Sequence, residues 1–273
     1  MSLLKIRSRY RSIKSLNSIL TALQMVTVVR MQRAKGKFAI AKDYLSGTEE
    51  VLAGRVKDPS LKKKVLVVIT SNRGLCAAFN KAVVLKAIDF INSNPGLQFI
   101  FFGRKGVDIL RRMPEYASRT LFSEFESIER TEFKKIRSVF RRIFDLNSEI
   151  YIAYNTYKSA VVQIPKIYRL YPVPEELEGE KEPSDFILEP DSETLVKELL
   201  YHYVEARFYQ IILDSQIGEL SARLMVLKGA VDNSKDLIDE LNISLNKARQ
   251  ASITKELMEI ISSAEALKVE YEG

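Results

Sequence analysis

A heptad repeat of apolar residues near the start of this 273-residue chain constrains its fold more than any other feature. Between Leu3 and Leu52, eleven of the fifteen a and d positions are apolar, and no proline interrupts them. A 3.5-residue repeat of this length is typical of a left-handed coiled coil. The positions are Leu3, Ile6, Tyr10, Ile13, Asn17, Leu20, Gln24, Thr27, Met31, Ala34, Phe38, Ala41, Leu45, Thr48 and Leu52.

A second repeat covers the last third of the chain. From Val196 to Ala248, fourteen of sixteen a and d positions are apolar, the exceptions being Gln210 and Ser234. Ser192, just after Pro190, is the expected helix cap. Across both repeats we predict a seam that includes Ile6, Ile13, Leu20, Met31, Phe38, Leu213, Leu220, Leu227, Ile238 and Leu241.

Each of the two predicted helices can bury the apolar seam of the other. Because a domain joins the end of one to the start of the other, an antiparallel pair is the simplest arrangement; the alternative is that each seam packs on its own domain, as in a bundle. Past Ala248 the register breaks, and Ile253, Leu257 and Ile260 form a shifted apolar set. Because this apolar surface exceeds what the seam can bury, we predict that other chains cover the helices.

The middle of the chain has a different periodicity. Strands are expected at 65–69, 99–102, 149–154 and 160–168, and helices near 79–91, 107–112 and 131–144. The last two strands are expected to form a hairpin across 155–159. This alternation predicts a Rossmann-like α/β domain with a partly parallel sheet. The predicted division is an N-terminal shaft helix (1–58), a central α/β foot domain (59–191) and a C-terminal shaft helix (192–273).

The amino-acid composition argues against several classes of catalytic and metal-binding site. Cys76 is the only cysteine and His202 the only histidine, which excludes an intrachain disulfide and argues against a Cys/His zinc site. No glycine-rich nucleotide motif occurs, and we interpret Gly103 to Gly106 as a plain strand-to-helix turn. The paired carboxylates Glu175 and Glu176 are expected in a solvated loop. We therefore predict no catalytic residue, cofactor site or metal site, and no stretch approaches the length of a membrane-spanning helix.

Charge is distributed very unevenly. Residues 1–64 hold 15 Lys or Arg against 4 acids, or +11, whereas residues 172–193 hold 1 Lys against 9 acids, or −8. A basic arm of this kind binds nucleic acid, an anionic membrane surface or an acidic protein. The basic N-terminus is also similar to a mitochondrial transit peptide, but the unbroken heptad register argues against that interpretation.

Four sequence segments resemble the gamma subunits of F-type ATP synthases. Residues 71–80, SNRGLCAAFN, are similar to that family's S-D-R-G-L-C-G-G-L-N motif, and residues 246–257, NKARQASITKEL, are close to its C-terminal signature. Residues 227–234 resemble its M-K-x-A-x-D-N-A segment, and residues near the start also fit. This chain departs from the pattern at Asn72, Ala77 and Ala78, which puts close backbone packing in the foot domain in question.

The resemblance implies a central rotor shaft. Its expected partners are three alpha and three beta subunits around the coiled coil, with the epsilon subunit and the c-ring at the foot domain. The implied contacts with the beta subunits use Arg223, Arg249, Gln250, Thr254 and the basic face of Arg7, Arg9, Arg30, Arg33 and Lys35. The implied location is the cytoplasmic face of the bacterial plasma membrane, and the implied work is non-catalytic coupling of ion-driven rotation to ATP synthesis or hydrolysis.

Two other functions stay open on the residues alone. A basic coiled-coil protein could bind nucleic acid or anionic lipid, with an affinity that falls steeply with salt. An enzyme with a degenerate dinucleotide-binding domain would bind a nucleotide through the fragment from about Lys64 to Tyr171.

Overall fold

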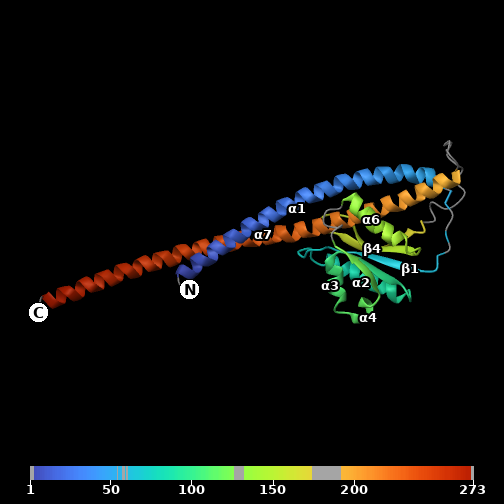
Figure 1. The fold of residues 1–273 in the computed structure, drawn as a ribbon. Coiled ribbons are helices and arrows are strands. Elements are labelled where there is room, and N and C mark those ends of the chain that lie inside the picture. Colours follow the sequence, from blue (N-terminus) through green and yellow to red (C-terminus); the bar gives the residue numbers. More distant parts are fainter. Residues whose placement is uncertain are drawn as a thin grey trace. The chain divides into compact units, whose positions relative to one another are not determined.

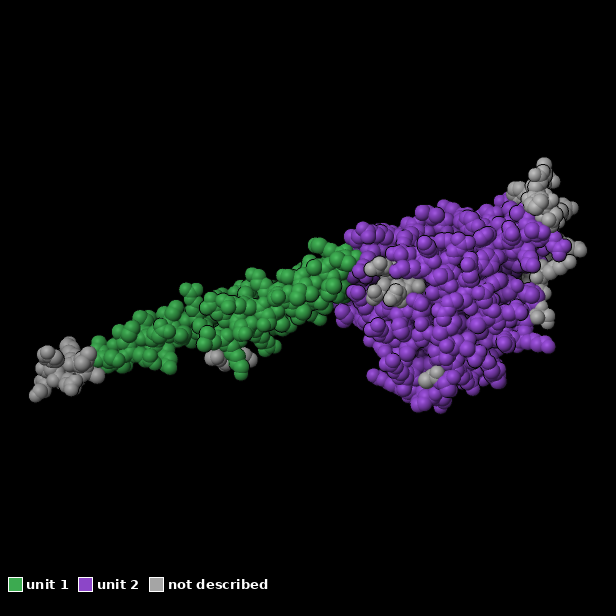
Figure 2. All heavy atoms as spheres, viewed as in Figure 1, with its two compact units in different colours: residues 1–26, 227–273 green, residues 27–226 purple. Residues whose placement is uncertain are grey.

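Two long helices, a five-stranded sheet and several shorter helices make up the part of the chain that the structure describes (Figure 1). The computed structural model describes residues 3–53, 55, 56, 59, 61–125, 132–173 and 192–271. Residues 1–26 with 227–273 form one compact unit, and residues 27–226 form the other (Figure 2). Helix α1 (Leu3–Leu52) and helix α7 (Ser192–Tyr271) each contribute to both units.

The predicted long helices are confirmed, and their burial follows the heptad spacing. All fifteen a and d positions of α1 and all sixteen of α7 are buried or half-buried. Of the ten seam residues named above, Ile6, Leu213, Leu220 and Leu227 are buried, and the other six are half-buried. This spacing buries one continuous stripe per helix because positions three and four residues apart share a face.

In the unit formed by residues 27–226, α1 and α7 run antiparallel. Glu49 of α1 accepts a hydrogen bond from the Tyr203 hydroxyl of α7 at 3.0 Å. Arg30, earlier in α1, lines a pocket with Leu220, later in α7. Residue numbers therefore rise along one helix as they fall along its neighbour, as the sequence predicts.

In the unit formed by residues 1–26 and 227–273, a polar pair sits in the seam. The Asn17 side-chain amide donates to Ser234 Oγ at 2.6 Å and to the Val231 carbonyl oxygen at 3.2 Å. Ser234 is buried, and its hydroxyl donates in turn to the Val231 carbonyl at 2.8 Å. Both polar seam residues are thus satisfied within the helix pair.

The sheet has the strand order β3-β2-β1-β4-β5. Strands β1 (Lys64–Ile69), β2 (Gln98–Phe102), β3 (Thr120–Glu124) and β4 (Glu149–Tyr157) are parallel, and β5 (Gln163–Tyr171) pairs antiparallel with β4. This mixed sheet confirms the predicted α/β class. The helices are α2 (Phe79–Asn92), α3 (Arg104–Leu110), α4 (Pro114–Ala117) and α6 (Phe133–Phe144).

Both faces of the sheet are covered, and its central strand β1 is apolar from Val65 onward. Val65, Val67 and Ile69 of β1 belong to a core shared with α6 and the two long helices. Leu66 and Val68 point to the opposite face, where α2 and α3 pack. A strand buried on both faces is expected to have a continuous apolar run, and β1 has one because helices cover both sides.

The structure corrects the hairpin. The turn lies at 158–162 and not at 155–159, because β4 continues to Tyr157. Asn155, a residue typical of turns, is buried and donates from its amide to the Phe79 carbonyl at 2.9 Å. The Asp214 carboxylate of α7 accepts hydrogen bonds from the Thr156 hydroxyl and the Tyr157 amide. Strand β3 and helix α4 are further elements that the sequence analysis did not anticipate.

Several expectations lie outside the described residues. They are the acidic connector from residue 174 onward with Glu175 and Glu176, the cap provided by the Ser192 side chain, and the first residue of the helix expected at 131–144. Glu193 does lie in the first turn of α7, where an acid is favourable. The three-part division at residues 58 and 191 stays a prediction.

Helix α1 meets the length and composition of a membrane span, which the sequence analysis did not expect. An 18-residue window within it has a mean hydropathy of 1.2 and no more than two charged residues, and 6% of that window is buried. The two results differ because mean hydropathy over a window tolerates polar residues, whereas the expectation was based on an uninterrupted apolar run. Core helices and N-terminal signal sequences pass the same test, so this feature is weak support for a span.

Candidate functional site

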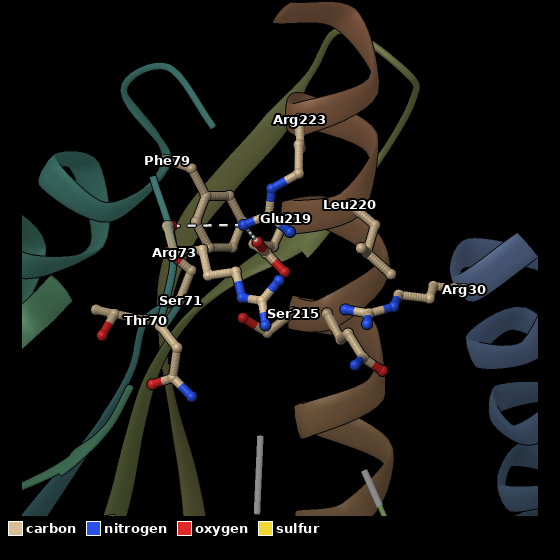
Figure 3. A pocket seen from close by; sticks show the side chains of 11 residues that line it. Arg30, Thr70, Ser71, Arg73, Phe79, Ser215, Glu219, Leu220 and Arg223 are labelled. Atoms are coloured by element: carbon tan, nitrogen blue, oxygen red, sulfur yellow. Dashed lines mark hydrogen bonds and ion pairs between the residues drawn. The ribbon is translucent and has the colours of Figure 1, made fainter. Parts of the chain in front are cut away.

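The turn that follows β1 is held against α7 by one arginine (Figure 3). Arg223 Nε donates to the Gly74 carbonyl oxygen at 3.3 Å, and its Nη2 donates to the carbonyl oxygens of Arg73 at 3.4 Å and Gly74 at 3.3 Å. The same guanidinium forms an ion pair with Glu219, one helical turn earlier in α7. Arg223 therefore joins the turn at residues 71–74 to the long helix.

Three arginines from three different segments surround this one carboxylate. Arg30 comes from α1, Arg73 from the turn and Arg223 from α7, and all three line a pocket with Glu219 (Figure 3). Burial raises the pKa of Glu219, while the charges of Arg223, Arg30 and Arg73 act to lower it. The cluster has three positive charges against one negative charge when the carboxyl is ionised.

A hydrogen-bond network shapes the turn itself. Asn80 Oδ1 accepts from the Ser71 amide at 2.8 Å, and its Nδ2 donates to Ser71 Oγ at 2.8 Å and to Cys76 Sγ at 3.1 Å. Cys76 is buried, and burial raises the pKa of its thiol. A buried thiol with a raised pKa is a poor nucleophile, so Cys76 contributes to the packing of this turn.

The backbone of this turn differs at the two alanines that depart from the family motif. Leu75 and Ala77 adopt positive φ angles of 62° and 48°, whereas Ala78 has an ordinary φ of −81°. Only the first alanine therefore occupies a conformation that favours glycine.

The glycines at 103 and 106 serve close packing. A Cβ added to Gly103 would lie 2.0 Å from the Thr70 carbonyl oxygen, and one added to Gly106 would lie 2.7 Å from a Phe101 ring atom. Thr70 Oγ1 accepts from the Gly106 amide at 2.9 Å. This arrangement supports the interpretation as a strand-to-helix turn.

The arginine pocket is too small for a nucleotide. Its volume is about 40 Å³, little more than the roughly 30 Å³ share of one liquid water molecule. Among the residues that the structure describes, no group of three His, Cys, Asp or Glu side chains could hold a metal ion. The geometry here is that of a small anion site or a contact with a partner's side chain.

The predicted beta-contacting residues fall into two groups. Arg30 and Arg223 share the pocket described above, with Arg30 exposed and Arg223 half-buried. The others lie along the helices without being gathered into one pocket. Arg7, Arg9, Arg33, Arg249, Gln250 and Thr254 are exposed, and Lys35 is half-buried with its Nζ 5.4 Å from the centre of the Tyr157 ring.

Two residues of the pocket were not singled out from the sequence. Glu219 precedes Arg223 by four residues, a spacing that places both on one helical face and could have signalled the pair. Arg73 lies in the quoted motif, but only the tertiary structure brings it to Arg30.

His202 is not part of this pocket. Its imidazole Nδ1 lies 3.6 Å from Glu205 Oε2, and Glu205 also pairs with Arg137 at 2.9 Å.

The last part of α7 presents an unpaired apolar face. From Gln250 to Ala264 every described side chain except Ser252 is exposed, including five large apolar residues with 47% to 65% exposure. They are Ile253, Leu257, Met258, Ile260 and Ile261. Apolar surface of this kind marks an interaction site.

Comparison with known proteins identifies the family. The family model described as ATP synthase matches residues 2–267. The ATP synthase gamma chain of Pelotomaculum thermopropionicum is 34% identical over 282 residues, covering 98% of this chain and 99% of the relative. That of Rubrobacter xylanophilus is 33% identical over 290 residues, covering 97% and 98%.

Solved structures share the fold. A chain in the cryo-EM structure of the Euglena gracilis mitochondrial ATP synthase (OSCP, F1 and c-ring) superposes with a TM-score of 0.70 and 19% identity, covering 99% of this chain and 96% of that chain. A chain of the Tetrahymena thermophila mitochondrial central stalk and c-ring gives a TM-score of 0.61 at 19% identity, covering 78% and 99%. On the strength of the sequence matches, this chain belongs to the ATP synthase gamma chain family.

Proposed function

We propose that this chain is the non-catalytic central stalk of an F-type ATP synthase. It couples ion-driven rotation of a c-ring to the conformational cycle of three catalytic beta subunits. The observation that supports this function most directly is the face of exposed apolar residues at the end of α7, which has no partner among the described residues of the chain. Family membership supplies the identity of the proteins that cover it.

The proposed partners divide between the helices and the sheet. Three alpha and three beta subunits surround the paired helices, and the epsilon subunit and the c-ring bind the α/β portion. The titles of the similar structures, which name F1 and the c-ring, support this set of partners.

The beta subunits are proposed to contact exposed polar and basic side chains. On α7 these are Arg249, Gln250 and Thr254, and on α1 they are Arg7, Arg9, Arg33 and Lys35. Arg30 and Arg223 add a contact at the turn after β1. Exposed arginines bind carboxylates through two parallel hydrogen bonds, so acidic loops are suitable partners.

The mechanism is a change of populations and not bond chemistry. As the asymmetric shaft turns, it presents a different face to each catalytic site and stabilises a different conformation there. A rotor must keep its shape while its partners change, and the buried seams and satisfied Asn17–Ser234 pair support that requirement. We further propose that the complex lies on the cytoplasmic face of a bacterial plasma membrane and is driven by protons or sodium ions.

Reconstitution tests this function. The full chain is mixed with alpha and beta subunits of a bacterial ATP synthase, and the mass of the complex and its ATPase rate are measured. We expect one copy per three alpha and three beta subunits and a higher rate of ATP hydrolysis. Failure of the folded chain to enter the complex would contradict the proposal.

A matched pair of variants tests the contact surface. Ile261→Asp places a charge on the exposed apolar face of α7, whereas Ser263→Asp adds the same charge two residues away at an exposed polar position. We expect the first variant to weaken assembly at least about tenfold, since burying an unpaired carboxylate is costly. The second is expected to assemble normally; equal losses in both would show that charge and not apolar contact matters.

A further inference from the structure

We propose that the pocket between Arg30, Arg73 and Arg223 binds one small oxyanion, such as inorganic phosphate. Arg30 and Arg223 are also proposed to contact the beta subunits, but binding of an anion requires only the residues of this chain. Three guanidinium groups reach it from α1, from the turn after β1 and from α7 (Figure 3).

The charges that line the pocket are unbalanced. Glu219 is the one acid lining the pocket, and its side chain is 14% exposed. Three arginines against one carboxylate leave an excess of two positive charges in a partly closed space. Arg30 and Arg73 are exposed, and a cluster of like charges lining a partly closed surface pocket attracts counter-ions, so an anion is expected to bind there.

Arg223 and Arg30 have hydrogen-bond donors that no described residue of the chain uses. The Nε and Nη2 atoms of Arg223 are occupied by the turn carbonyls and by Glu219. Its Nη1 makes no hydrogen bond to the part of the chain that the structure describes. Arg30 is exposed and likewise forms no hydrogen bond or ion pair with the described residues. These planar donors match the geometry of phosphate and sulfate oxygens.

Two of the neutral lining residues, Ser71 and Asn72, already form hydrogen bonds within the chain. The Ser71 hydroxyl donates to the Arg73 carbonyl at 2.6 Å and accepts from Asn80. The Asn72 amide donates to the Phe125 carbonyl, and its Oδ1 accepts from the Arg104 amide at 2.9 Å. Recognition in this pocket therefore depends on the arginines, which favours a compact charged ligand over a neutral one.

The volume of the pocket further restricts which ligands can bind. A volume of about 40 Å³ holds little more than one water molecule of roughly 30 Å³. The pocket is only partly enclosed, so part of a tetrahedral anion can remain in solvent. A nucleotide or another large organic anion does not fit, whereas a single phosphate or sulfate group does.

Glu219 allows a specific test, because its carboxylate lies in the pocket where the anion is proposed to bind. Its carboxylate repels a second negative charge, while its ion pair holds Arg223 in place. Glu219→Gln keeps the shape of the side chain and removes the charge. An anion site predicts tighter phosphate binding in this variant, whereas a purely structural ion-pair cluster predicts no phosphate binding in either form.

The test is a calorimetric titration of the folded full chain with sodium phosphate, without any other subunit. Ionic strength is held constant with sodium chloride, and a parallel titration uses sodium sulfate. We expect one saturable site per chain for both anions, with several-fold tighter phosphate binding in Glu219→Gln. Failure to saturate, or several weak sites per chain, would overturn the proposal.

Charge-matched variants locate the site. Arg30→Gln removes a pocket arginine that makes no hydrogen bond to the described residues, so the fold is expected to survive. Arg111→Gln removes an arginine of α3's C-cap whose side chain is 75% exposed. We expect at least about a tenfold loss of phosphate affinity in Arg30→Gln, as for a lost charged hydrogen bond, and no change in Arg111→Gln.

Equal affinities in the Arg30→Gln and Arg111→Gln variants would place any binding elsewhere and overturn the proposal. Arg73→Gln is the second pocket variant, with circular dichroism confirming that it is folded. Because no alpha or beta subunit is present, a failure here is distinct from a failure of the rotor function, which shows only in the assembled complex.

Discussion

Two stretches of the same helix behave in opposite ways. Between Tyr203 and Leu227, α7 is buried or half-buried at every position except Met225. Between Gln250 and Ala264, it is exposed at every position except Ser252. Both stretches contain apolar residues at helical spacing, so the pattern that predicts a helix does not reveal whether its apolar face is covered by this chain.

The difference comes from what lies around each stretch. Phe208 is fully buried, with its ring 5.5 Å from the rings of Phe102 in β2 and Phe140 in α6. Leu45 and Leu52 of α1 belong to the same core. The first stretch is therefore enclosed by a sheet strand and two helices, while the second shows no such neighbours among the described residues. One continuous helix therefore contributes to the stability of this chain through residues 203–227 and leaves residues 250–264 available to a partner.

The largest expected effect is a truncation in the enclosed stretch. Phe208→Ala removes an aromatic side chain from a packed core, which costs about 3–5 kcal/mol of unfolding free energy. Urea denaturation followed by circular dichroism measures this loss. A loss below about 1 kcal/mol would mean that the enclosed stretch is not a packed core, and the contrast between the two stretches would fail.

A smaller effect is expected where polar residues interrupt the seam. Asn17→Leu replaces a polar seam residue with an apolar one, and Ser234 keeps its hydrogen bond to the Val231 carbonyl. We expect a gain of about 1 kcal/mol, because polar seam residues fix the register at a cost in stability. Ser18→Leu, at an exposed position of the same helix, is the matched control and is expected to change little. A clear loss in Asn17→Leu would show that the polar pair is itself stabilising.

The enclosed stretch also predicts a pH effect at Asp214. Burial raises the pKa of its carboxyl despite hydrogen bonds from Thr156 and Tyr157. An acid whose pKa is higher in the folded than in the unfolded state stabilises fully below its unfolded pKa, and that stabilisation is lost as pH rises through the folded pKa.

Asp214→Asn tests this sign. Relative to the variant, the wild-type chain is expected to lose unfolding free energy as the pH rises from about 4 towards 7. Urea denaturation at several pH values measures the difference between the two proteins. A difference that stays constant, or that changes in the opposite direction, would exclude the buried-carboxyl explanation.

The smallest effect on stability is expected in the exposed stretch. Leu257→Ala removes an exposed side chain and is expected to change the unfolding free energy by less than about 0.5 kcal/mol. The same variant is expected to weaken assembly with alpha and beta subunits, measured by sedimentation. If it instead destabilised the isolated chain as strongly as Phe208→Ala, the two stretches would not differ in kind.

Much of the fold could be predicted, because helices and strands have different periods. The bounds of α1 and the positions of β1 and β2 follow from local spacing. The hairpin turn was placed three residues early because Asn155 is typical of turns, yet here its amide is buried against Phe79. Strand β3 was missed because most of its side chains are only half-buried, which leaves a weak apolar signal.

The candidate site was less accessible from the sequence. Arg30 and Arg223 were singled out through a family resemblance, but nothing in their spacing shows that they share a pocket with Arg73. Residues that are 43 to 193 positions apart come together only when the helices pair and the turn after β1 packs on α7. The spacing of Glu219 and Arg223 could have signalled their ion pair, but nothing local shows that Glu219 also lies in a pocket with Arg30 and Arg73.

The sequence by itself determined the two long helices, their seam and the α/β class, because periodicity and strand propensity are local properties. The motif at 71–80 and the C-terminal signature also determined the family. The tertiary structure alone decided which apolar faces are covered, where the hairpin turns and which charges meet around Glu219. These features depend on contacts between distant segments, whose energies no local pattern encodes.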